Sequence, residues 1–450
     1  MSENDTPNAQ TTLAAATEAL DTRGRDLKAV VSIPYETAKA EAVERDALTA
    51  AGISLGPLHG LPVVVKDIIH VAGMKTRGGS ATRPDPAPAT ADAFVVSQLR
   101  RAGAIVAAKS ATVEYAFGGW GTNASQGTPH NPYRPDEPHT PGGSSSGTGA
   151  LVGAGIVPAG LGTDTGGSVR IPAAFCGCVG HKTSIGLVSR SGVLPLSDTF
   201  DTIGPLADTV ARAADMLAAM QGEDLSDPST VGIPRADPRE GLDRGVSGLR
   251  LAALAPSQLH ATTPEIMAHF KASIDTLRAA GATITDLALP QSLEEYQRRA
   301  TVIIASDAYA FHSEMADDPA APLNDTTRIR ILMGKNLTAR DRILAQRTRA
   351  ADIADFLAAL DRFDALILPA SAVPPSPIAT ADEDDYRMSL HTRFGNYLDL
   401  CGLSVPIGLA QSGLPTSLQI VGRHLTDSLV LRIGAAYEAA RGPYPAAPLN

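Results

Sequence analysis

Two Gly-Gly-Ser segments lie close together in the first half of the chain, at Gly142-Gly143-Ser144 and Gly166-Gly167-Ser168. Their serines are 24 positions apart, and the small apolar residues between them can form a helix and then a strand. Paired glycines adopt backbone torsions closed to other residues and expose successive N–H groups. A serine in such a turn can act as a nucleophile beside donors for a developing oxyanion. The pattern therefore predicts acyl-transfer chemistry, with two tight packing turns as the structural alternative.

A lysine in an apolar setting offers a candidate base. Lys66 follows the strand-like run Val63-Val64-Val65, and the apolar pair Ile68-Ile69, where the strand is expected to resume, comes two residues later. Burial disfavours the charged form of a lysine, so a desolvated lysine can be a neutral base near pH 7. Most lysines are nevertheless solvated, so this stretch alone leaves both interpretations open.

Other hydrolase and phosphate-binding patterns fit less well. The run from Gly143 to Gly147 matches G-x-S-x-G, the nucleophile elbow, but small residues satisfy this pattern easily and no later histidine has a distinctive context. No lysine has a serine three residues before it, and neither Gly-Gly turn is followed by lysine as a phosphate loop requires. The ten histidines are scattered rather than clustered as metal ligands would be.

The composition limits the partners and the compartment. A net charge of −10 argues against a nucleic-acid or anionic-membrane surface. No apolar run approaches the roughly 18 residues that span a bilayer, and the N-terminus lacks the apolar core of a secretory signal. Three cysteines are too few for a disulfide framework and suggest buried free thiols. We therefore expect a cytoplasmic protein without nucleic acid or membrane as partners.

Helix and strand patterns alternate along the chain, which is typical of an α/β architecture. We expect polar, disordered residues at 1–10 and a single large domain over 11–450. Long loops commonly carry function, and residues 118–128, 197–203 and the region after Gln291 are candidates for substrate contacts. The predicted helices cover residues 13–20, 37–51, 93–102, 208–220, 263–280 and 427–440, together with 291–360, which breaks near 319–322 and 338. The predicted strands cover residues 63–65, 104–108, 249–254, 282–289, 365–369, 403–407 and 417–421.

Three motifs occur in one order along the chain. They are Gly56-Pro57-Leu58-His59-Gly60-Leu61-Pro62 with Lys66-Asp67, then Pro141-Gly142-Gly143-Ser144-Ser145-Ser146-Gly147, then Gly162-Thr163-Asp164-Thr165-Gly166-Gly167-Ser168-Val169-Arg170-Ile171-Pro172-Ala173. The chain resembles the amidase signature family in the order of these motifs, in their spacing and in the interval between the two serines. The similarity extends to the C-terminal Leu414-Pro415 and Gln419-Ile420. The resemblance implies a central mixed β-sheet flanked by helices.

The resemblance also implies a Ser–cis-Ser–Lys triad. Ser168 would be the nucleophile, Ser144 the middle serine reached through a cis peptide from Gly143, and Lys66 the base. A relay through a lysine and a serine would take the place of the histidine in other serine hydrolases.

Around this triad, the resemblance implies an oxyanion hole from the backbone N–H groups of Thr165, Gly166, Gly167 and Ser168. Asp164 and Arg170 would brace the loop, and Ser145 would hydrogen-bond within the triad. The family's chemistry needs no metal and no organic cofactor.

The predicted function is an amidohydrolase that cleaves the C–N bond of a small linear amide to a carboxylate and ammonia or an amine. One alternative is an allophanate- or biuret-derivative hydrolase, since Asp399-Leu400-Cys401 resembles the allophanate hydrolases. Those enzymes are expected to hold the carboxylate with a tyrosine–arginine pair, whereas residues 301–312 contain Tyr309 but no arginine.

A second alternative is the glutaminase-type component of an amidotransferase, which passes ammonia to a partner. A small-molecule amide is the expected substrate. A homodimer or a small accessory subunit is the expected assembly.

Overall fold

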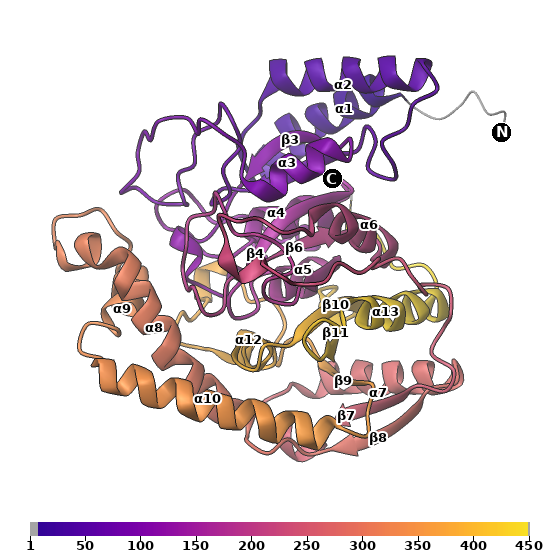
Figure 1. The fold of residues 1–450 in the computed structure, drawn as a ribbon, viewed down its shortest axis with the longest axis vertical. Helices are drawn as coiled ribbons and strands as arrows, with labels where there is room; N and C mark the ends of the chain where they lie inside the picture. The colour runs from indigo at the N-terminus through magenta and orange to yellow at the C-terminus, as the bar shows by residue number, and fades with distance from the viewer. Residues whose placement is uncertain (1–7, 449–450) are drawn as a thin grey trace.

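A mixed sheet of eleven strands runs through the middle of the molecule in a computed structural model that describes residues 8–448 (Figure 1). The strand order is β1-β3-β2-β4-β6-β5-β10-β11-β9-β7-β8. Strands β3, β2 and β4 are parallel neighbours, as are β9, β7 and β8, and the strands between these two groups pair antiparallel. The expected single-domain α/β fold with a mixed sheet is confirmed.

The strands are β1 (Val30–Ser32), β2 (Pro62–Lys66), β3 (Ile105–Ser110), β4 (Ala159–Asp164), β5 (Val179–Lys182), β6 (Thr202–Ala207), β7 (Arg250–Leu254), β8 (Thr283–Leu287), β9 (Ala365–Pro369), β10 (Cys401–Leu409) and β11 (Pro415–Gly422). The α-helices are α1 (Ala9–Ala19), α2 (Tyr35–Ala50), α3 (Phe94–Arg101), α4 (Ser146–Gly153), α5 (Arg170–Cys176), α6 (Val210–Met220), α7 (Pro264–Ala279), α8 (Leu293–Asp317), α9 (Asp325–Leu332), α10 (Ala339–Leu360), α11 (Arg387–Leu390), α12 (Arg393–Tyr397) and α13 (Asp427–Arg441). The short helices are η1 (Leu20–Gly24), η2 (Glu114–Ala116), η3 (Pro228–Thr230), η4 (Pro256–Gln258) and η5 (Ile378–Thr380).

Helices cover both faces of the sheet. On one face α3, α6, α13 and α7 contact one another in that order, and on the other α4 packs on β2, β4 and β6 while α5 packs on β5, β10 and β11. Strand β2 is therefore buried on both of its faces. Val63 and Val65 belong to the larger of two buried apolar clusters, and Val64 belongs to the smaller one. A strand buried on both faces reads as a continuous apolar run.

The predicted elements agree with the structure apart from a few boundaries and omissions. The two-residue continuation of the strand at Ile68-Ile69 is wrong, because the N–H groups of both residues bond back to the Lys66 carbonyl, and Ile69 forms only an isolated antiparallel bridge with Val193. The disorder expected for residues 1–10 does not include Ala9 and Gln10, because helix α1 begins at Ala9. Residues 1–7 lie outside the described part of the chain. Strands β1, β5 and β6 and helices α5, α11 and α12 had no counterpart among the predicted elements.

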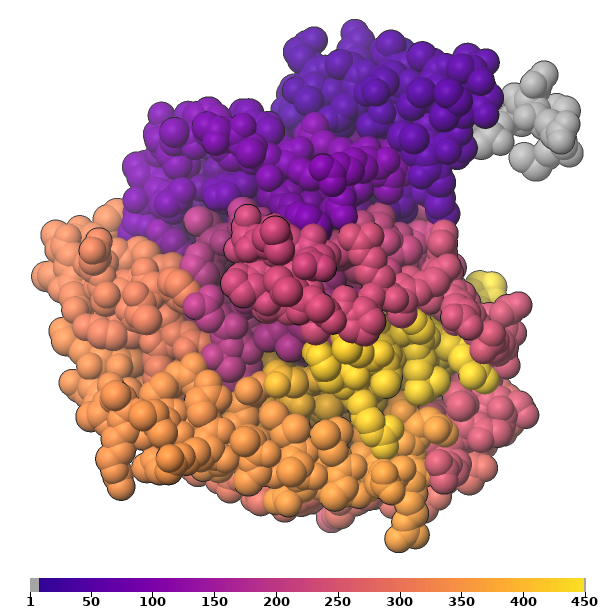
Figure 2. Space-filling model, viewed as in Figure 1, coloured from indigo at the N-terminus to yellow at the C-terminus, as the bar shows by residue number. Residues whose placement is uncertain are grey.

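The long helical region divides where the sequence predicts. Helix α8 ends at Asp317 before the proline-containing segment, and α10 begins after Thr338, whose side chain forms a capping box with Asp341. In the space-filling view the segment from α8 to α10 (orange) forms one side of the molecule and borders the indigo and magenta half (Figure 2). These helices therefore add a wall beside the sheet rather than another layer on it.

An aromatic cluster connects this wall to the short helix α12. Phe394 of α12 lies 6.2 Å from Phe356 of α10 and 6.5 Å from Tyr296 of α8, measured between ring centroids. Aromatic side chains contribute large buried areas and prefer such offset and tilted arrangements. The cluster fixes the position of α12 relative to α8 and α10.

Residues 8–448 contain no helix whose length and apolar character would allow it to cross a membrane. The three cysteines are buried free thiols, as the composition suggests.

Replacing Phe356 by alanine is expected to lower the free energy of unfolding by about 3–5 kcal/mol, because the change removes a fully buried ring and leaves a cavity. Leu357→Ala on the same helix is the matched control, since Leu357 is 37% exposed and its removal should cost less than about 1 kcal/mol. Urea unfolding followed by tryptophan fluorescence and circular dichroism measures both. Equal losses for the two variants would contradict the proposed role of the cluster.

Candidate active site

A cavity of about 470 Å³ lies beside the second Gly-Gly-Ser turn. Thr165, Gly166 and Ser168 form one part of its lining. The wall helices form another part through Gln297, Thr301, Ile304, Ala305, Ile329 and Arg330. The region after Gln291 and the start of the 118–128 loop, Gly118 and Gly119, thus reach the cavity as expected.

Lys66 stands at the C-terminal end of β2, next to the end of β4. The two strands are parallel neighbours with Val65 opposite Leu161, so their ends meet at one edge of the sheet. The Lys66 Nζ lies 2.7 Å from both Ser144 Oγ and Thr163 Oγ1, and its side chain is fully buried. Burial lowers the pKa of Lys66 to about 7, although the carboxylates of Asp201 and Asp164 partly oppose the shift. A large fraction of this lysine is neutral at physiological pH.

Ser144 follows a cis peptide bond from Gly143, as the family resemblance implies. Its carbonyl oxygen accepts hydrogen bonds from Val113 N at 3.1 Å and Thr112 Oγ1 at 3.0 Å. A methyl group on Gly143 would lie 2.7 Å from Gly121 N, so only glycine fits at this close backbone approach. The backbone around the Ser144 hydroxyl is therefore held on several sides.

Ser168 lies in the loop between β4 and α5 and is 8% exposed at the cavity. Its hydroxyl makes no hydrogen bond to any residue between 8 and 448, which leaves it open toward the cavity. The preceding Gly167 has φ +130°, and a methyl group there would lie 2.2 Å from Thr392 Oγ1. Both the torsion and the close contact require glycine.

The donors of the expected oxyanion hole differ in their availability. Gly167 N donates to Asp164 Oδ1 at 2.8 Å, so this N–H group is already engaged, contrary to the expectation. The N–H groups of Thr165, Gly166 and Ser168 bond to no acceptor in the described chain. These three groups remain the candidates for stabilising an oxyanion.

Asp164 and Arg170 form a buried ion pair behind the loop. Arg170 Nε and Nη2 donate to the Asp164 carboxylate at 3.0 and 2.8 Å. The remaining contacts of the guanidinium reach Thr392 O, Asn396 Oδ1 and Gln419 Oε1. Burial alone would raise the pKa of Asp164, but Arg170 outweighs it and holds that pKa well below its usual range. The pair has the geometry of the bracing role that the resemblance implies.

Ser145 contributes through its backbone rather than through its hydroxyl, contrary to the expectation. Its Oγ lies 3.2 Å from Thr163 N and 3.3 Å from Thr163 O, away from the triad hydroxyls. Its backbone N–H donates to Ser168 O at 3.2 Å. Ser145 thus connects the two Gly-Gly-Ser turns mechanically.

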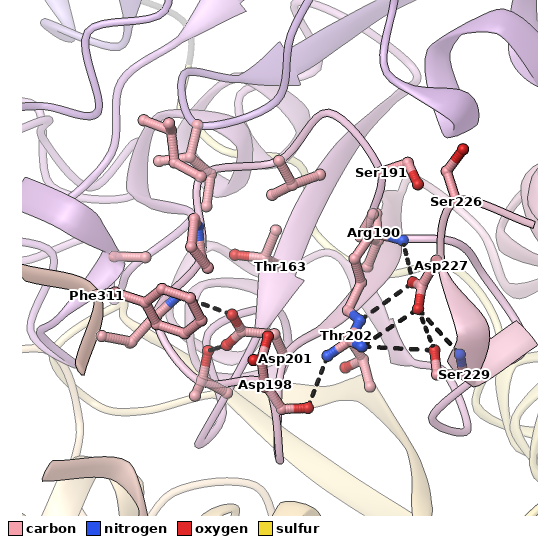
Figure 3. A pocket seen from close by; sticks show the side chains of 18 of the residues that line it. Thr163, Arg190, Ser191, Asp198, Asp201, Thr202, Ser226, Asp227, Ser229 and Phe311 are labelled. Carbon is pink, nitrogen blue, oxygen red and sulfur yellow. Dashed lines mark hydrogen bonds and ion pairs between the residues drawn. The ribbon is translucent and has the colours of Figure 1, made fainter. Parts of the chain in front are cut away.

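A second cavity, of about 480 Å³, is lined by Thr163 and by Thr165, which also lines the first cavity (Figure 3). At one side of this cavity Asp201 accepts a hydrogen bond from Thr165 Oγ1 at 2.5 Å. At the other side Arg190 pairs with Asp227. The 197–203 loop therefore lines this cavity and not the one at Ser168.

The sequence patterns did not single out three functional candidates. Thr163 lies inside the Gly-Thr-Asp motif, and Asp201 precedes the Thr-Ile-Gly-Pro segment, so their neighbours in sequence could have indicated them. Arg393, which lines the first cavity, lies in none of the motifs. No group of three histidine, cysteine, aspartate or glutamate side chains within residues 8–448 could hold a metal ion.

Comparison with known proteins identifies the family. Residues 12–431 match the family model Amidase, so the chain belongs to the amidase signature family. The A subunit of the glutamyl-tRNA(Gln) amidotransferase of Acidobacterium capsulatum is 33% identical, with 96% of this chain and 95% of the relative covered.

Solved structures show the same fold. An inhibitor-bound vestigial complex of an s-triazine catabolic enzyme gives a TM-score of 0.90 at 29% identity, with 96% and 94% of the two chains covered. The peptide amidase of Stenotrophomonas maltophilia gives 0.84 at 30% identity, with 98% and 95% covered. The chain is therefore an enzyme of a family that contains carbon–nitrogen hydrolases and amidotransferase subunits.

The pH dependence of kcat/KM should report the Lys66 base. Because only the neutral amine can accept a proton, kcat/KM is expected to fall about tenfold per pH unit below an inflection near pH 7 and to level off above it. Initial rates on any hydrolysed amide between pH 5 and 9 measure the profile. A rate that is level down to pH 5 would contradict a base with this pKa.

Asp201→Asn should move that inflection to lower pH. The Asp201 carboxylate favours the charged form of Lys66, and an asparagine removes this charge. Its amide oxygen can still accept from the N–H groups of Leu196 and Ser197, and its NH2 group can then donate to the Thr165 hydroxyl. Asp198→Asn, an exposed position on the same cavity, is the control and should leave the inflection in place. An inflection that moves upward or stays fixed in Asp201→Asn would contradict the electrostatic coupling.

Proposed function

We propose that this enzyme hydrolyses the C–N bond of a small linear amide through an acyl-enzyme on Ser168, with Ser144 and Lys66 as the proton relay. The observation that carries the proposal is the buried contact between Lys66 Nζ and Ser144 Oγ at 2.7 Å. A lysine with a pKa of about 7 is matched to proton transfer at neutral pH.

The proposed relay runs from Ser168 through Ser144 to Lys66, of which the contact between Ser144 and Lys66 is formed in the structure. Neutral Lys66 takes the proton of Ser144 while Ser144 takes that of Ser168, and the Ser168 oxygen adds to the amide carbon. Free N–H groups of Thr165 and Gly166 would stabilise the oxyanion. The proton then passes back to the leaving nitrogen, and the amine departs. Water, activated by the same relay, cleaves the acyl ester, so amide and water give carboxylate and amine or ammonia.

The cavity supports a compact substrate. A volume of about 470 Å³ falls in the lower half of the range of small-molecule sites. The similarity to an s-triazine catabolic enzyme favours small nitrogen-rich amides, including allophanate and biuret derivatives. Against allophanate, Tyr309 is not part of the cavity lining, and its hydroxyl donates to Asp317.

A second candidate is the glutaminase-type component of an amidotransferase, which delivers ammonia to a partner. The curated relatives, which are A subunits of glutamyl-tRNA(Gln) amidotransferases, are 31–35% identical over most of the chain and favour this function over a free-standing amidohydrolase. The same relay would release ammonia from glutamine. The similarity to a chain from a protein complex adds support for a small accessory subunit, with a homodimer as the other arrangement.

Ammonia or amine release from a panel of amides tests the proposal. The panel contains glutamine, malonamate, aliphatic and aryl amides, biuret and allophanate, and the purified chain is compared with Ser168→Ala. Loss of the nucleophile should lower kcat by at least about 10³-fold. Ser428→Ala on α13 is the control and should keep full activity.

The pattern of activity separates the two candidates. Activity of the chain alone on a small amide supports the amidohydrolase, and activity confined to glutamine in the presence of a partner supports the amidotransferase component. Full activity of Ser168→Ala on a hydrolysed substrate would refute the shared mechanism.

A further inference from the structure

The guanidinium of Arg393 lines the Ser168 cavity without a protein partner. Within residues 8–448 none of its nitrogens makes a hydrogen bond or an ion pair, and its Nε is buried from solvent. The side chain as a whole is partly exposed at the cavity, whereas its Nε has lost its hydration without gaining a hydrogen bond, and such buried polar atoms are rarely left without a partner. The absence of a protein partner therefore indicates that a ligand group can pair with Arg393 in the cavity.

The location of Arg393 is closely defined. A methyl group on Gly166 would lie 3.4 Å from both Cζ and Nε of Arg393, so the guanidinium packs on the loop that carries the nucleophile. Thr392 Oγ1 donates to Gly166 O at 2.8 Å, and Arg170 Nη1 donates to Thr392 O at 2.8 Å. These contacts hold the start of α12 against the loop, and Arg393 is placed by the same framework as Ser168.

The other charges around the cavity do not neutralise Arg393. Arg330 forms an ion pair with the Glu383 carboxylate, which also accepts a hydrogen bond from Thr122. Asp384 is exposed at the rim of the cavity. Burial lowers the pKa of Arg393 to about 10, repulsion from Arg330 adds to the shift and the Asp164 carboxylate, already paired with Arg170, partly opposes it. The side chain is still a cation at neutral pH. The inner part of the cavity has an excess of positive charge.

We propose that Arg393 binds a carboxylate of the substrate beside the scissile amide, so that the enzyme selects anionic amides over neutral ones. The inference rests on the proposed amide hydrolysis at Ser168 and names the class of substrate for it. Guanidinium groups bind carboxylates through two parallel hydrogen bonds. The Nη1 and Nη2 groups of Arg393, which have no protein partner within residues 8–448, are free for such a contact at the cavity.

The required substrate is short. Gly166 and Ser168 are two residues apart, so their Cα atoms are separated by at most about 7 Å. A carboxylate at Arg393 and a carbonyl at Ser168 therefore belong to one small molecule. Amides of short dicarboxylic acids place the carboxylate on the acyl side, and N-acyl amino acids place it on the amine side.

Matched substrate pairs test the selection and distinguish the two sides. Succinamate is compared with succinamide for the acyl side, and N-acetylglycine with N-isobutylacetamide for the amine side. We expect the wild type to prefer the anionic member of one pair by at least about tenfold in kcat/KM. Arg393→Gln should lower kcat/KM on that member by about 10- to 100-fold and on its neutral counterpart by less than about threefold.

Two further variants separate charge recognition from structural damage. Arg393→Lys keeps the charge without the planar fork and should lose less than Arg393→Gln on the anionic substrate. Arg387→Gln, on the neighbouring helix α11 with its partner Asp385, should change neither substrate. Equal losses on the anionic and neutral substrates in Arg393→Gln would overturn the inference, as would a wild type without preference for the anion.

Binding supplies a readout that does not depend on turnover. In the Ser168→Ala protein, succinate or N-acetylglycine at constant ionic strength should raise the melting temperature, and Ser168→Ala/Arg393→Gln should lose this rise. If neither anion stabilises the protein and no anionic amide is hydrolysed, the inference fails. Hydrolysis of neutral amides that depends on Ser168 would then leave the proposed function intact, so the two can fail separately.

Discussion

The buried ion pair between Asp164 and Arg170 connects β4, α5, α12 and β11 behind the loop that carries Ser168. Asp164 ends β4 and accepts the N–H of Gly167, whereas Arg170 begins α5 and reaches α12 and β11. Breaking one partner of such a pair leaves an uncompensated buried charge, which is strongly destabilising. Other conformations of the loop with Ser168 would break the ion pair and leave one charged side chain without its partner, so the loop is rigid. A nucleophile has to be held in a fixed position near the oxyanion donors.

The chemistry of Lys66 depends on the same enclosure. Its amine becomes a base near neutral pH because the sheet and the Gly-Gly-Ser turns exclude water from it. The carboxylates of Asp164 and Asp201 limit the shift, so the site balances desolvation against two nearby charges. Complete burial without these carboxylates would make the lysine a weaker base, and greater exposure would keep it protonated.

The cavity combines a shared scaffold with features particular to this chain. The sheet belongs to the fold that this chain shares with the solved relatives. The wall of α8–α10 and the short helix α12 shape the space above Ser168 and bring Arg330 and Arg393 to it. The fold provides the scaffold, and the side chains placed on it determine the selectivity. Relatives with similar sequence identity to this chain can therefore have different activities.

Much of the fold could be predicted from the sequence, because local patterns encode it. Apolar periodicity located the long helices, and a proline-containing segment and the cap at Thr338 located their breaks. Strands β5 and β6 escaped prediction, since β5 is short, β6 contains glycine and proline, and both are recognisable mainly by their pairing with β4 and β10.

The sequence by itself indicated Lys66, Ser144 and Ser168 as candidates, because the order and spacing of the motifs that resemble the family are properties of the chain alone. Only the tertiary structure decided what surrounds them. The engagement of the Gly167 N–H by Asp164 and the unpaired cation of Arg393 became visible only in the folded chain. Arg393 and Gly166 are more than 200 residues apart, and their contact arises from the packing of α12 rather than from any local pattern.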